Sequence, residues 1–490
     1  MARTRTAAAI VAVLAATALA APPQATGSAG ADPYGQSIDW AGCSGVQGPA
    51  SMECGTLTVP RDYAEPRKSG DLDVAVSRIP ATGPGPRLGS LVVNFGGPGI
   101  PGIAELAERT AAGELARLNR SYDLIGFDPR GTGRSSPVDC GDLSGVTSTD
   151  PAAQARQVAQ ECRRHSGALL PWVGTPNAAK DLDVVRSALG DDRLAYLGFS
   201  YGGRLGSVYA HEFPQHTGRM VLDGVPDPTL DDTQTALAQA AAFQHALNDF
   251  AADCAARGCP VPGRTAAEVV AGIRAAGRGL SDKGLATVSG RLDRAGYLQA
   301  VQNALYSKDN WPFLREALSA LHGGDGELMM QLAYPGQLGV APGPVHGSSW
   351  PAPDSYEMSK LAIDCRDTPE RHTAAGVHAL DARFAAASPV FGASIESTLL
   401  SCSGWPPGDP ASRRVAAPAA PEALLVSTTG DPATPYPGAA HMAAALGNGS
   451  RVLTYRGEGH GAYFAHNPCV VSTVEAYLVD GAVPGRGAVC

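Results

Sequence analysis

Residues 194–213, which read LAYLGFSYGGRLGSVYAHEF, contain the signals of a strand, a sharp turn and a helix in direct succession. The apolar run 194–198 predicts a buried strand, and residues 201–213 have the apolar spacing of a helix. Between them, Gly198-Phe199-Ser200-Tyr201-Gly202 matches the pattern G-x-S-x-G, whose glycines permit a tight turn that exposes a serine hydroxyl. The stretch therefore predicts a reactive Ser200 at the carboxyl end of a strand.

Strand and helix signals alternate on both sides of this stretch. Short runs rich in β-branched and other apolar residues predict strands, and alanine-rich stretches of helical length lie between several of them. This alternation indicates an α/β protein with a mostly parallel central sheet. The other expected strands are residues 55–60, 72–79, 90–95, 122–127, 219–223, 423–428 and 451–455, and the expected core helices include 181–189, 438–446 and 470–479.

The alternation stops between residues 229 and 418. This region is rich in Ala, Leu, Gln and Arg, has helical spacing over 236–252 and 266–276, and contains few strand candidates. We expect it to be an inserted helical cap. The insertion divides the core into a first part, 39–228, and a C-terminal part, 419–490, which together would complete one sheet.

A serine hydroxyl is a weak nucleophile near neutral pH, so the motif calls for a base and for a carboxylate that orients the base. His460 lies in the glycine-flanked loop Gly459-His460-Gly461, directly after an expected strand. Asp431 follows the expected strand 423–428 in Gly430-Asp431-Pro432, from where a carboxylate can reach the imidazole. The chain order serine, aspartate, histidine predicts a triad of Ser200, Asp431 and His460.

Other interpretations of these residues are open. His441 is the alternative histidine, on a helix surface. The segment around Asp431 could form an ordinary Gly-Asp-Pro turn. Glu458 could in principle orient His460, but two residues away on the same loop it is badly placed.

A second glycine-rich loop, Asn94-Phe95-Gly96-Gly97-Pro98-Gly99, follows an expected strand next to the nucleophile strand. Glycine lets backbone N–H groups approach a ligand closely, so the loop can face an oxyanion that develops during the reaction. We assign this oxyanion hole to the N–H groups of Gly97 and Tyr201, with Gly96 as the alternative. A phosphate-binding loop is the competing interpretation, but neither G-K-[ST] nor G-x-G-x-x-G follows.

The composition excludes several classes of protein. Of the 490 residues 44% are hydrophobic and 17% are charged, which excludes an intrinsically disordered chain. A mean hydropathy of -0.07 excludes a polytopic membrane protein. The formal net charge of -9 argues against a general nucleic-acid-binding surface. We expect no nucleic-acid partner, no stable membrane insertion, no cofactor, and a monomer.

The N-terminal segment has the features of an export signal. Arg3 and Arg5 form a short basic start, an apolar run follows, and Ala18-Leu19-Ala20 fits an A-x-A cleavage site. We expect residues 1–20 to be a Sec-type signal peptide and 21–38 a flexible leader. A membrane anchor is the alternative, but the apolar run is short for a bilayer span. The scarcity of lysine beside abundant Arg and Ala indicates a bacterial genome, so we expect a secreted bacterial protein.

Ten cysteines agree with export, because disulfides persist outside the cytosol and an even number can pair completely. Their spacing does not fix the connectivity. We expect neighbours along the chain to pair: Cys43 with Cys54, Cys140 with Cys162, Cys254 with Cys259, Cys365 with Cys402, and Cys469 with Cys490. No second Cys or His pair lies at metal-ligand spacing near Cys254 and Cys259, so no metal site is predicted.

Several motifs occur together in one known group of enzymes: Gly96-Gly97-Pro98-Gly99, Asp128-Pro129-Arg130-Gly131-Thr132-Gly133-Arg134-Ser135, Gly198-Phe199-Ser200-Tyr201-Gly202-Gly203 and Gly430-Asp431-Pro432. With them the chain resembles the secreted tripeptidyl aminopeptidases, serine peptidases related to the prolyl aminopeptidases. The resemblance covers nearly all of the sequence after the leader. It implies an α/β-hydrolase fold with an inserted helical cap, and it implies the same triad. Phe95 stands where prolyl aminopeptidases usually carry a histidine, which brings the chain closer to the tripeptidyl group.

The resemblance also directs attention to the cap. An aminopeptidase must hold a free ammonium group at a fixed distance from the scissile carbonyl, which calls for carboxylates in the cap. Glu357, Asp364 and Asp367 are the candidates, although each also fits an ordinary solvated helix charge. Thr434 fits the family pattern as well, and we expect it near the Asp431 carboxylate.

These features predict a secreted serine exopeptidase that releases short peptides, by the resemblance tripeptides, from free N-termini through an acyl-enzyme. Relatives with similar motifs include esterases, so a secreted carboxylesterase or lipase with the same triad is the alternative. A non-catalytic binding module would not require the intact triad. His460 must be neutral to accept the Ser200 proton, so activity should rise through about pH 6 to 7 if its pKa is near the ordinary histidine value.

Overall fold

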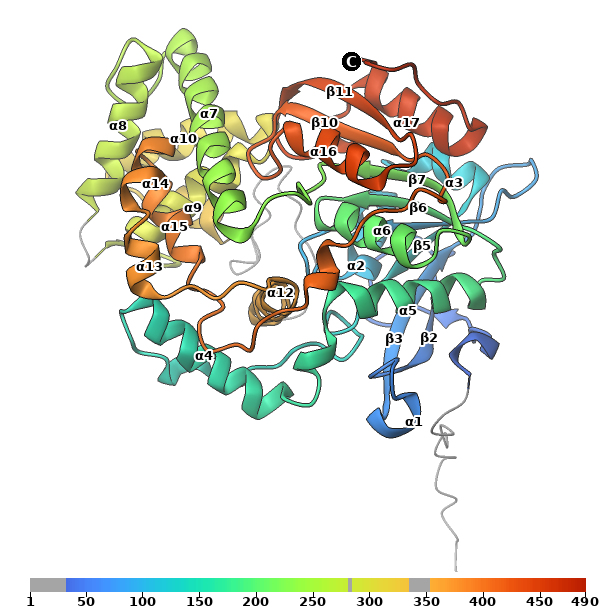
Figure 1. The fold of residues 1–490 in the computed structure, drawn as a ribbon. Coiled ribbons are helices and arrows are strands. Elements are labelled where there is room, and N and C mark those ends of the chain that lie inside the picture. Colours follow the sequence, from blue (N-terminus) through green and yellow to red (C-terminus); the bar gives the residue numbers. More distant parts are fainter. Residues whose placement is uncertain (1–31, 281–283, 335–352) are drawn as a thin grey trace, which may run out of the picture.

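The computed structural model describes residues 32–280, 284–334 and 353–490 (Figure 1). The expected signal peptide and the first part of the expected leader lie outside these ranges. A nine-stranded sheet has the order β1-β2-β3-β5-β4-β6-β7-β10-β11. All pairs from β5 to β11 are parallel, whereas antiparallel pairs join β1, β2, β3 and β5. The strands are β1 Ala41–Gly42, β2 Glu53–Pro60, β3 Asp71–Ile79, β4 Ser90–Asn94, β5 Asp123–Phe127, β6 Leu194–Phe199, β7 Thr217–Asp223, β10 Leu424–Gly430 and β11 Arg451–Glu458.

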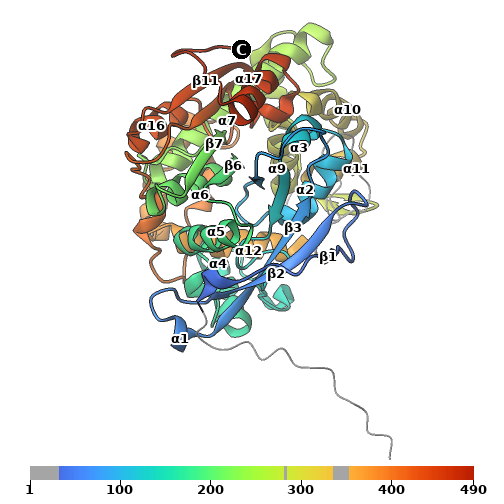
Figure 2. The same ribbon diagram turned by 90° about the vertical axis from the view of Figure 1, so that its right-hand side faces the viewer.

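Helices cover both faces of this sheet (Figures 1 and 2). One buried apolar cluster joins the sheet to α5, α6 and α16, and another joins it to α2, α3 and α17. In β6, Tyr196 enters the first cluster and Leu197 the second, so the strand is buried on both faces and its sequence is continuously apolar. The core helices are α1 Pro66–Ser69, α2 Gly102–Ala111, α3 Ala116–Ser121, α4 Pro151–Ser166, α5 Thr175–Ala188, α6 Tyr201–Glu212, α16 Pro437–Leu446 and α17 Pro468–Asp480. The predicted α/β-hydrolase fold with a mostly parallel sheet is confirmed.

Helices α7 to α15 lie between β7 and β10 in the chain, within the region expected to form the cap. Most of them share a separate buried apolar cluster. The exception is α12, whose Ala362, Ile363 and Cys365 belong to the cluster of the core. The hairpin β8–β9 was not predicted. The elements are α7 Asp232–Arg257, α8 Ala266–Gly279, β8 Leu285–Thr287, β9 Gly290–Leu292, α9 Arg294–Leu305, α10 Trp311–His322, α11 Glu327–Ala333, α12 Pro353–Asp367, α13 Ala374–His378, α14 Asp381–Ala387 and α15 Gly392–Thr398.

Five disulfide bonds pair all ten cysteines, and each joins the two neighbours expected from the sequence. The bond between Cys365 and Cys402 attaches α12 to the segment after α15, and the bond between Cys469 and Cys490 attaches the chain end to α17. Such a set of disulfides is consistent with an extracellular protein. Across the described ranges, no helix is both long enough and apolar enough to span a membrane.

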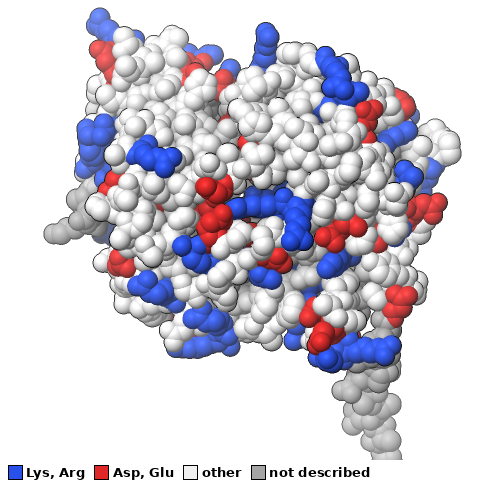
Figure 3. Space-filling model, in the orientation of Figure 1, with Lys and Arg blue, Asp and Glu red and all other residues white. Residues whose placement is uncertain are grey.

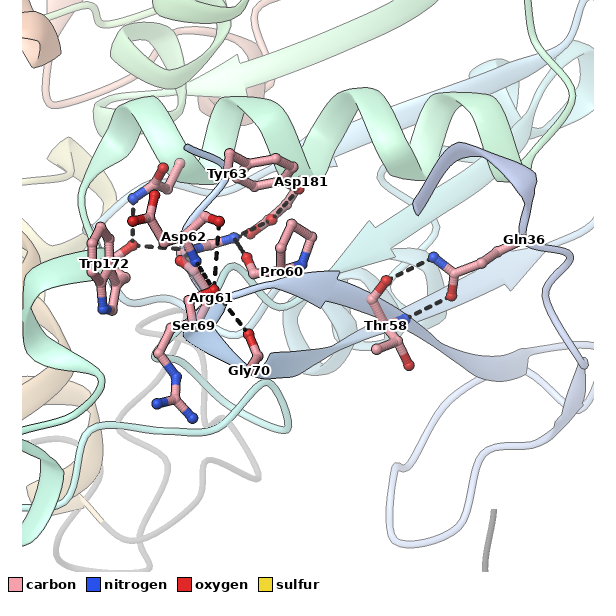
Figure 4. A network of polar contacts seen from close by, with 12 residues as sticks. Gln36, Thr58, Pro60, Arg61, Asp62, Tyr63, Ser69, Gly70, Trp172 and Asp181 are labelled. Carbon is pink, nitrogen blue, oxygen red and sulfur yellow. Dashed lines mark hydrogen bonds and ion pairs between the residues drawn. The ribbon is translucent and has the colours of Figure 1, made fainter. Parts of the chain in front are cut away.

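A buried arginine ties the loop after β5 to two other segments. Arg130 is fully buried, and its guanidinium donates to both carboxylate oxygens of Asp181 on α5 at 2.5 and 2.6 Å. It also donates to the main-chain carbonyls of Pro60, Arg61 and Trp172. Figure 4 shows these acceptors around one centre, from the end of β2, from α5 and from the turn before it. The loop that carries Arg130 is therefore anchored on several sides.

We expect Arg130→Leu to lower the free energy of unfolding by about 3–5 kcal/mol, because Asp181 would remain as a buried carboxylate without its cation. Urea unfolding followed by circular dichroism measures the change. Arg134→Leu is the matched control on the same loop, since the Arg134 side chain is exposed, and its effect should stay within about 0.5 kcal/mol. Equal losses in the two variants would contradict the anchoring role of Arg130.

Candidate active site

Ser200 lies in the sharp turn between β6 and α6, with φ 55° and ψ -120°. A residue other than glycine rarely adopts a positive φ, so the surrounding structure holds this turn. A Cβ on Gly198 would lie 2.6 Å from the carbonyl oxygen of Gly202, and a Cβ on Gly202 would lie 2.6 Å from that of Asn94. Both glycines of the motif are therefore required for close packing. The N–H of Ser200 donates to the main-chain oxygen of Asp223 at 2.8 Å.

Asp431 and His460 meet at the same edge of the sheet, after β10 and β11. The imidazole Nδ1 lies 3.0 and 2.9 Å from the two carboxylate oxygens of Asp431. The carboxylate is 3% exposed. Its Oδ1 accepts the N–H groups of Ala433 and Thr434, and its Oδ2 accepts the Thr434 hydroxyl, each at 2.9 Å. These bonds fix the carboxylate, and the carboxylate in turn orients the imidazole.

The end of β7 connects the serine turn with the imidazole. The main-chain oxygen of Asp223 accepts the Ser200 N–H, and the next residue, Gly224, lies against the ring of His460. A Cβ on Gly224 would come within 3.2 Å of the imidazole Cε1. The three residues predicted from the sequence as a triad are thus grouped around this short segment.

The charge around His460 favours its protonated form. Burial of the imidazole lowers its pKa, but the negative charges of Asp431 and Asp223, together with the hydrogen bond to Asp431, outweigh burial. The pKa of His460 is therefore raised above its ordinary value. The carboxylate that bonds Nδ1 would also stabilise a positive charge on the imidazole.

The insertion holds the histidine loop through its main chain. The N–H of His460 donates to the carbonyl oxygen of Tyr306, at the end of α9, at 2.8 Å. Ser307 and Gly459 form an isolated antiparallel bridge beside this bond. The Tyr306 ring meets the imidazole edge-on, with ring centroids 5.5 Å apart. The position of His460 thus depends on residues from both the core and the insertion.

The main-chain N–H groups of the glycine-rich loop after β4 differ in their hydrogen bonding. The N–H of Gly96 donates to the Asn94 side chain at 3.1 Å. Within the described residues, no hydrogen bond involves the N–H of Gly97 or of Tyr201. A Cβ on Gly96 would lie 3.0 Å from the Ser200 Cβ, so the loop lies directly beside the serine.

One of the three cap carboxylates lies away from solvent. Asp367 is 2% exposed and accepts both the N–H and the hydroxyl of Thr175, at 2.8 and 2.5 Å. The Thr175 hydroxyl is also 2.7 Å from the phenolic oxygen of Tyr201. Asp367 therefore supports the side chain of Tyr201, and its own carboxylate is already occupied.

The other two cap carboxylates lie nearer the surface of α12. Glu357 is exposed, and no hydrogen bond to it occurs within the described residues. Asp364 accepts a hydrogen bond from Lys360 at 2.6 Å. A Cβ on Gly99 would lie 3.0 Å from the main-chain nitrogen of Lys360. The helix that carries these acids therefore packs against the glycine-rich loop beside Ser200.

A family model described as TAP-like protein matches residues 388–490. Relatives also match almost the whole chain. Serine protease Hip1 of Mycobacterium tuberculosis (strain H37Rv) is 36% identical, over 93% of this chain and 91% of its own. Tripeptidyl aminopeptidase of Streptomyces coelicolor is 33% identical, over 92% and 86%, and Carboxylesterase B of M. tuberculosis (strain H37Rv) is 35% identical, over 90% and 86%. The chain belongs to the TAP-like family of α/β-hydrolases. Peptidase and esterase names both occur among these relatives. Membership of this family therefore establishes that the protein is a serine hydrolase, the activity class that both names share.

Two contributors to this TAP-like site were not predicted from the sequence. Asp223 ends a strand at the same edge of the sheet as Asp431. Its position at the end of a predicted strand is the sequence feature that could have identified it. Tyr306 carries no such signal, because it comes from the insertion and contacts the site mainly through its main chain. Three phenylalanines also link the loops of the site. Phe199 stacks on Phe464 with centroids 4.6 Å apart and on Phe95 at 6.1 Å.

We expect the activity of this TAP-like hydrolase to rise with pH along a limb whose midpoint lies above the ordinary histidine value of about 6.5. The base must be neutral to accept a proton, and the pKa of His460 is raised, so a higher pH is needed to deprotonate it. Initial rates with p-nitrophenyl butyrate across the pH range measure the midpoint. The rates are recorded at a wavelength where the absorbance of the product, p-nitrophenol, does not depend on its ionisation. A midpoint at or below the ordinary value would contradict the electrostatics of the site.

Proposed function

We propose that this TAP-like hydrolase is a secreted serine exopeptidase that releases tripeptides from free N-termini through an acyl-enzyme. The observation that carries the peptidase part is the position of α12, which packs against the loop beside Ser200 and bears the exposed carboxylate of Glu357. The relative named tripeptidyl aminopeptidase supports the same activity, and the length of the released peptide is taken from it.

In the proposed reaction, Ser200 Oγ attacks the scissile carbonyl carbon while His460 Nε2 takes its proton. Nδ1 stays bonded to Asp431, so the imidazolium forms next to a carboxylate that is already in place. His460 then gives the proton to the leaving amine, which departs and leaves the acyl-enzyme. Water, activated by the same base, attacks the ester and releases the short peptide.

The proposed oxyanion hole consists of the N–H groups of Gly97 and Tyr201. The N–H of Ser200 is bonded to Asp223 and that of Gly96 to Asn94, so neither is available for the oxyanion. Tyr201 lies at the first position of α6, where the positive end of the helix dipole also favours a developing negative charge. The donors are preorganised, because both adjoin tightly packed glycine turns.

Glu357 is the proposed partner of the substrate ammonium. Asp364 is already paired with Lys360, and Asp367 is occupied by Thr175, so Glu357 is the carboxylate of this set that is open to a ligand. A carboxylate at a fixed distance from the oxyanion hole would select peptides whose free N-terminus lies a set number of residues before the scissile bond. Asp364 would add negative charge nearby.

The proposal also covers the export of the enzyme, the size of its substrate and its oligomeric state. Export is supported by the features of residues 1–20 and by the five disulfide bonds. On the face drawn in Figure 3, basic and acidic side chains are interspersed, with a mixed group near the centre where core and insertion meet. Such a surface suits a small peptide substrate better than a nucleic acid. We propose that the protein acts as a monomer on such peptides.

The test compares four substrates: Ala-Pro-Ala-p-nitroanilide, its N-acetylated form, Pro-p-nitroanilide and p-nitrophenyl butyrate. The proposal expects cleavage of the free tripeptide anilide and loss of at least about tenfold on acetylation, since one charge-assisted contact contributes about 1.5–3 kcal/mol. Glu357→Gln should bring the free and acetylated rates closer together. Equal cleavage of the free and acetylated anilides would overturn the exopeptidase assignment.

The relative named Carboxylesterase B supports an esterase as the second candidate. That candidate expects rapid turnover of p-nitrophenyl butyrate with negligible release from all three anilides. Mass spectrometry of a digested long peptide separates the two cases further. Successive losses of three residues from the N-terminus support the peptidase, whereas internal fragments contradict an exopeptidase.

A further inference from the structure

A second buried carboxylate lies beside the proposed triad. Asp223 is the last residue of β7, the strand between the one that ends at the nucleophile turn and the one that ends near Asp431. Its relative exposure is 0%. The proposed chemistry assigns it no proton transfer and no contact with substrate. A buried acid is costly to keep in a fold, so its bonds indicate what it does.

Asp223 binds two separate loops of the site at once. Its main-chain oxygen accepts the N–H of Ser200 at 2.8 Å. Its carboxylate accepts the N–H of Ala462 at 3.0 and 2.9 Å and that of Tyr463 at 2.8 Å. Ala462 and Tyr463 lie two and three residues after His460. One residue thus bonds both to the nucleophile turn and to the histidine loop.

The partners of this carboxylate are backbone N–H groups, as they are for the buried Asp128. Asp181, which is equally buried, is paired with Arg130. No arginine or lysine is bonded to Asp223 within the described residues, and its hydrogen bonds come from backbone N–H groups alone. A structural ion pair therefore does not account for this residue. The titratable cation that interacts with this charge is the imidazole of His460.

We propose that Asp223 is a positioning residue that fixes the spacing between the Ser200 turn and the His460 loop, and that its negative charge strengthens His460 as a base. This inference rests on the catalytic roles proposed for Ser200 and His460. Asp223 acts through these two residues and touches no substrate. Asp431 orients the ring of the base, whereas Asp223 holds the loop that carries it.

The electrostatics agree with this geometry. The titratable groups that face Asp223 are His460, after β11, and Asp431, after β10. Burial raises the pKa of Asp223 to about 6, against the opposing effect of the two backbone N–H groups. The negative charge of Asp223 raises the pKa of His460, in the same direction as Asp431. Removal of that charge should therefore lower the pKa of the base.

The experiment measures the rate at which a fluorophosphonate phosphonylates the full-length protein, over about pH 5 to 9. This reaction requires an active serine but does not depend on whether the natural substrate is a peptide or an ester. Asp223→Asn keeps the shape and removes the charge. Its amide –NH₂ would also face backbone donors, so the loop must shift. Asp227→Asn is the matched control, since Asp227 lies near the same end of β7 but binds His441 and Thr229.

We expect Asp223→Asn to react about 10- to 100-fold more slowly on the alkaline plateau, because a small misplacement of the base is costly. The midpoint of its pH profile should fall by about half to one pH unit. Asp227→Asn should match the wild type in both quantities. Asp223→Glu keeps the charge but displaces the carboxylate, so its plateau should fall while its midpoint stays. If Asp223→Asn does not fold, the plateau and the midpoint of Asp223→Glu are the measurements that test the inference.

The outcomes separate this inference from the proposed function. If the wild type does not react, the proposed nucleophile and this inference are both overturned. If wild type and Asp227→Asn react but Asp223→Asn keeps the wild-type plateau and midpoint, the inference alone is overturned. A fall in thermal stability without any change in plateau or midpoint also overturns it, because a purely structural role would have that result. A wild-type plateau in Asp223→Glu overturns the positioning role.

Discussion

Ser200→Ala is expected to lower kcat by about 10⁴- to 10⁶-fold on whichever substrate the protein cleaves best. The substitution removes the only atom that would form the acyl-enzyme, while the oxyanion donors and the base stay in place. Steady-state rates against the best substrate measure the loss. Intact-protein mass spectrometry after treatment with a fluorophosphonate should show an adduct on the wild type and none on the variant.

The fold should survive this change. The N–H of residue 200 still reaches the Asp223 carbonyl, and alanine fits the turn as well as serine does. Ser207→Ala is the matched control, because Ser207 lies buried on α6 and, among the described residues, its hydroxyl donates only to the Gly203 carbonyl, at 2.7 Å. The control should keep nearly full activity. Residual activity of more than about one per cent in Ser200→Ala would exclude Ser200 as the nucleophile.

Asp431→Asn should lower kcat at neutral pH by about 10⁴-fold. The reason lies in the partners of the carboxylate. The N–H groups of Ala433 and Thr434 both donate to Oδ1, so an asparagine would turn its oxygen toward them and its amide nitrogen toward His460. The imidazole Nδ1 would then have to accept a hydrogen bond. The proton would move to Nε2, and that nitrogen could no longer take the serine proton.

Glu458→Gln is the control for this prediction, because Glu458 is the last residue of β11 and its carboxylate lies two residues before His460 in the chain. Within the described residues its Oε2 is buried without a hydrogen-bond partner, and no hydrogen bond joins Glu458 to His460. The variant should stay within a few-fold of wild-type kcat, at roughly the level of a neutral substitution. Comparison of kcat for the two variants decides the point. A large loss in Glu458→Gln with little loss in Asp431→Asn would reverse the assignment of the orienting acid.

The core of the fold was predictable because its strands are buried on both faces. The strands β4 and β5 read as short, nearly continuous apolar runs, each followed by a glycine-rich loop, and this is a strong local signal. The sequence of a strand does not indicate whether the strand pairs in parallel or antiparallel with its neighbours. Strands β2 and β3 were expected from their apolar residues, but their antiparallel pairing depends on partners elsewhere in the chain.

The site was predictable where strand ends determine it. Asp431 and His460 follow neighbouring parallel strands, whose carboxyl ends meet at one edge of the sheet. The contributions from the insertion were not predictable in this way. Whether α12 turns Asp367 or Glu357 toward a ligand depends on how that helix packs against the core. The contact of Tyr306 with His460 joins residues far apart in sequence, and no local pattern indicates it.

The contact of the insertion with the histidine loop has a consequence for biosynthesis. His460 donates its main-chain N–H to Tyr306, and Gly459 pairs with Ser307, so the base takes its place only after α9 has docked on the core. A chain that is only half folded has the serine but lacks a positioned histidine. Hydrolytic activity would then begin only when the insertion has docked, as a late step of folding.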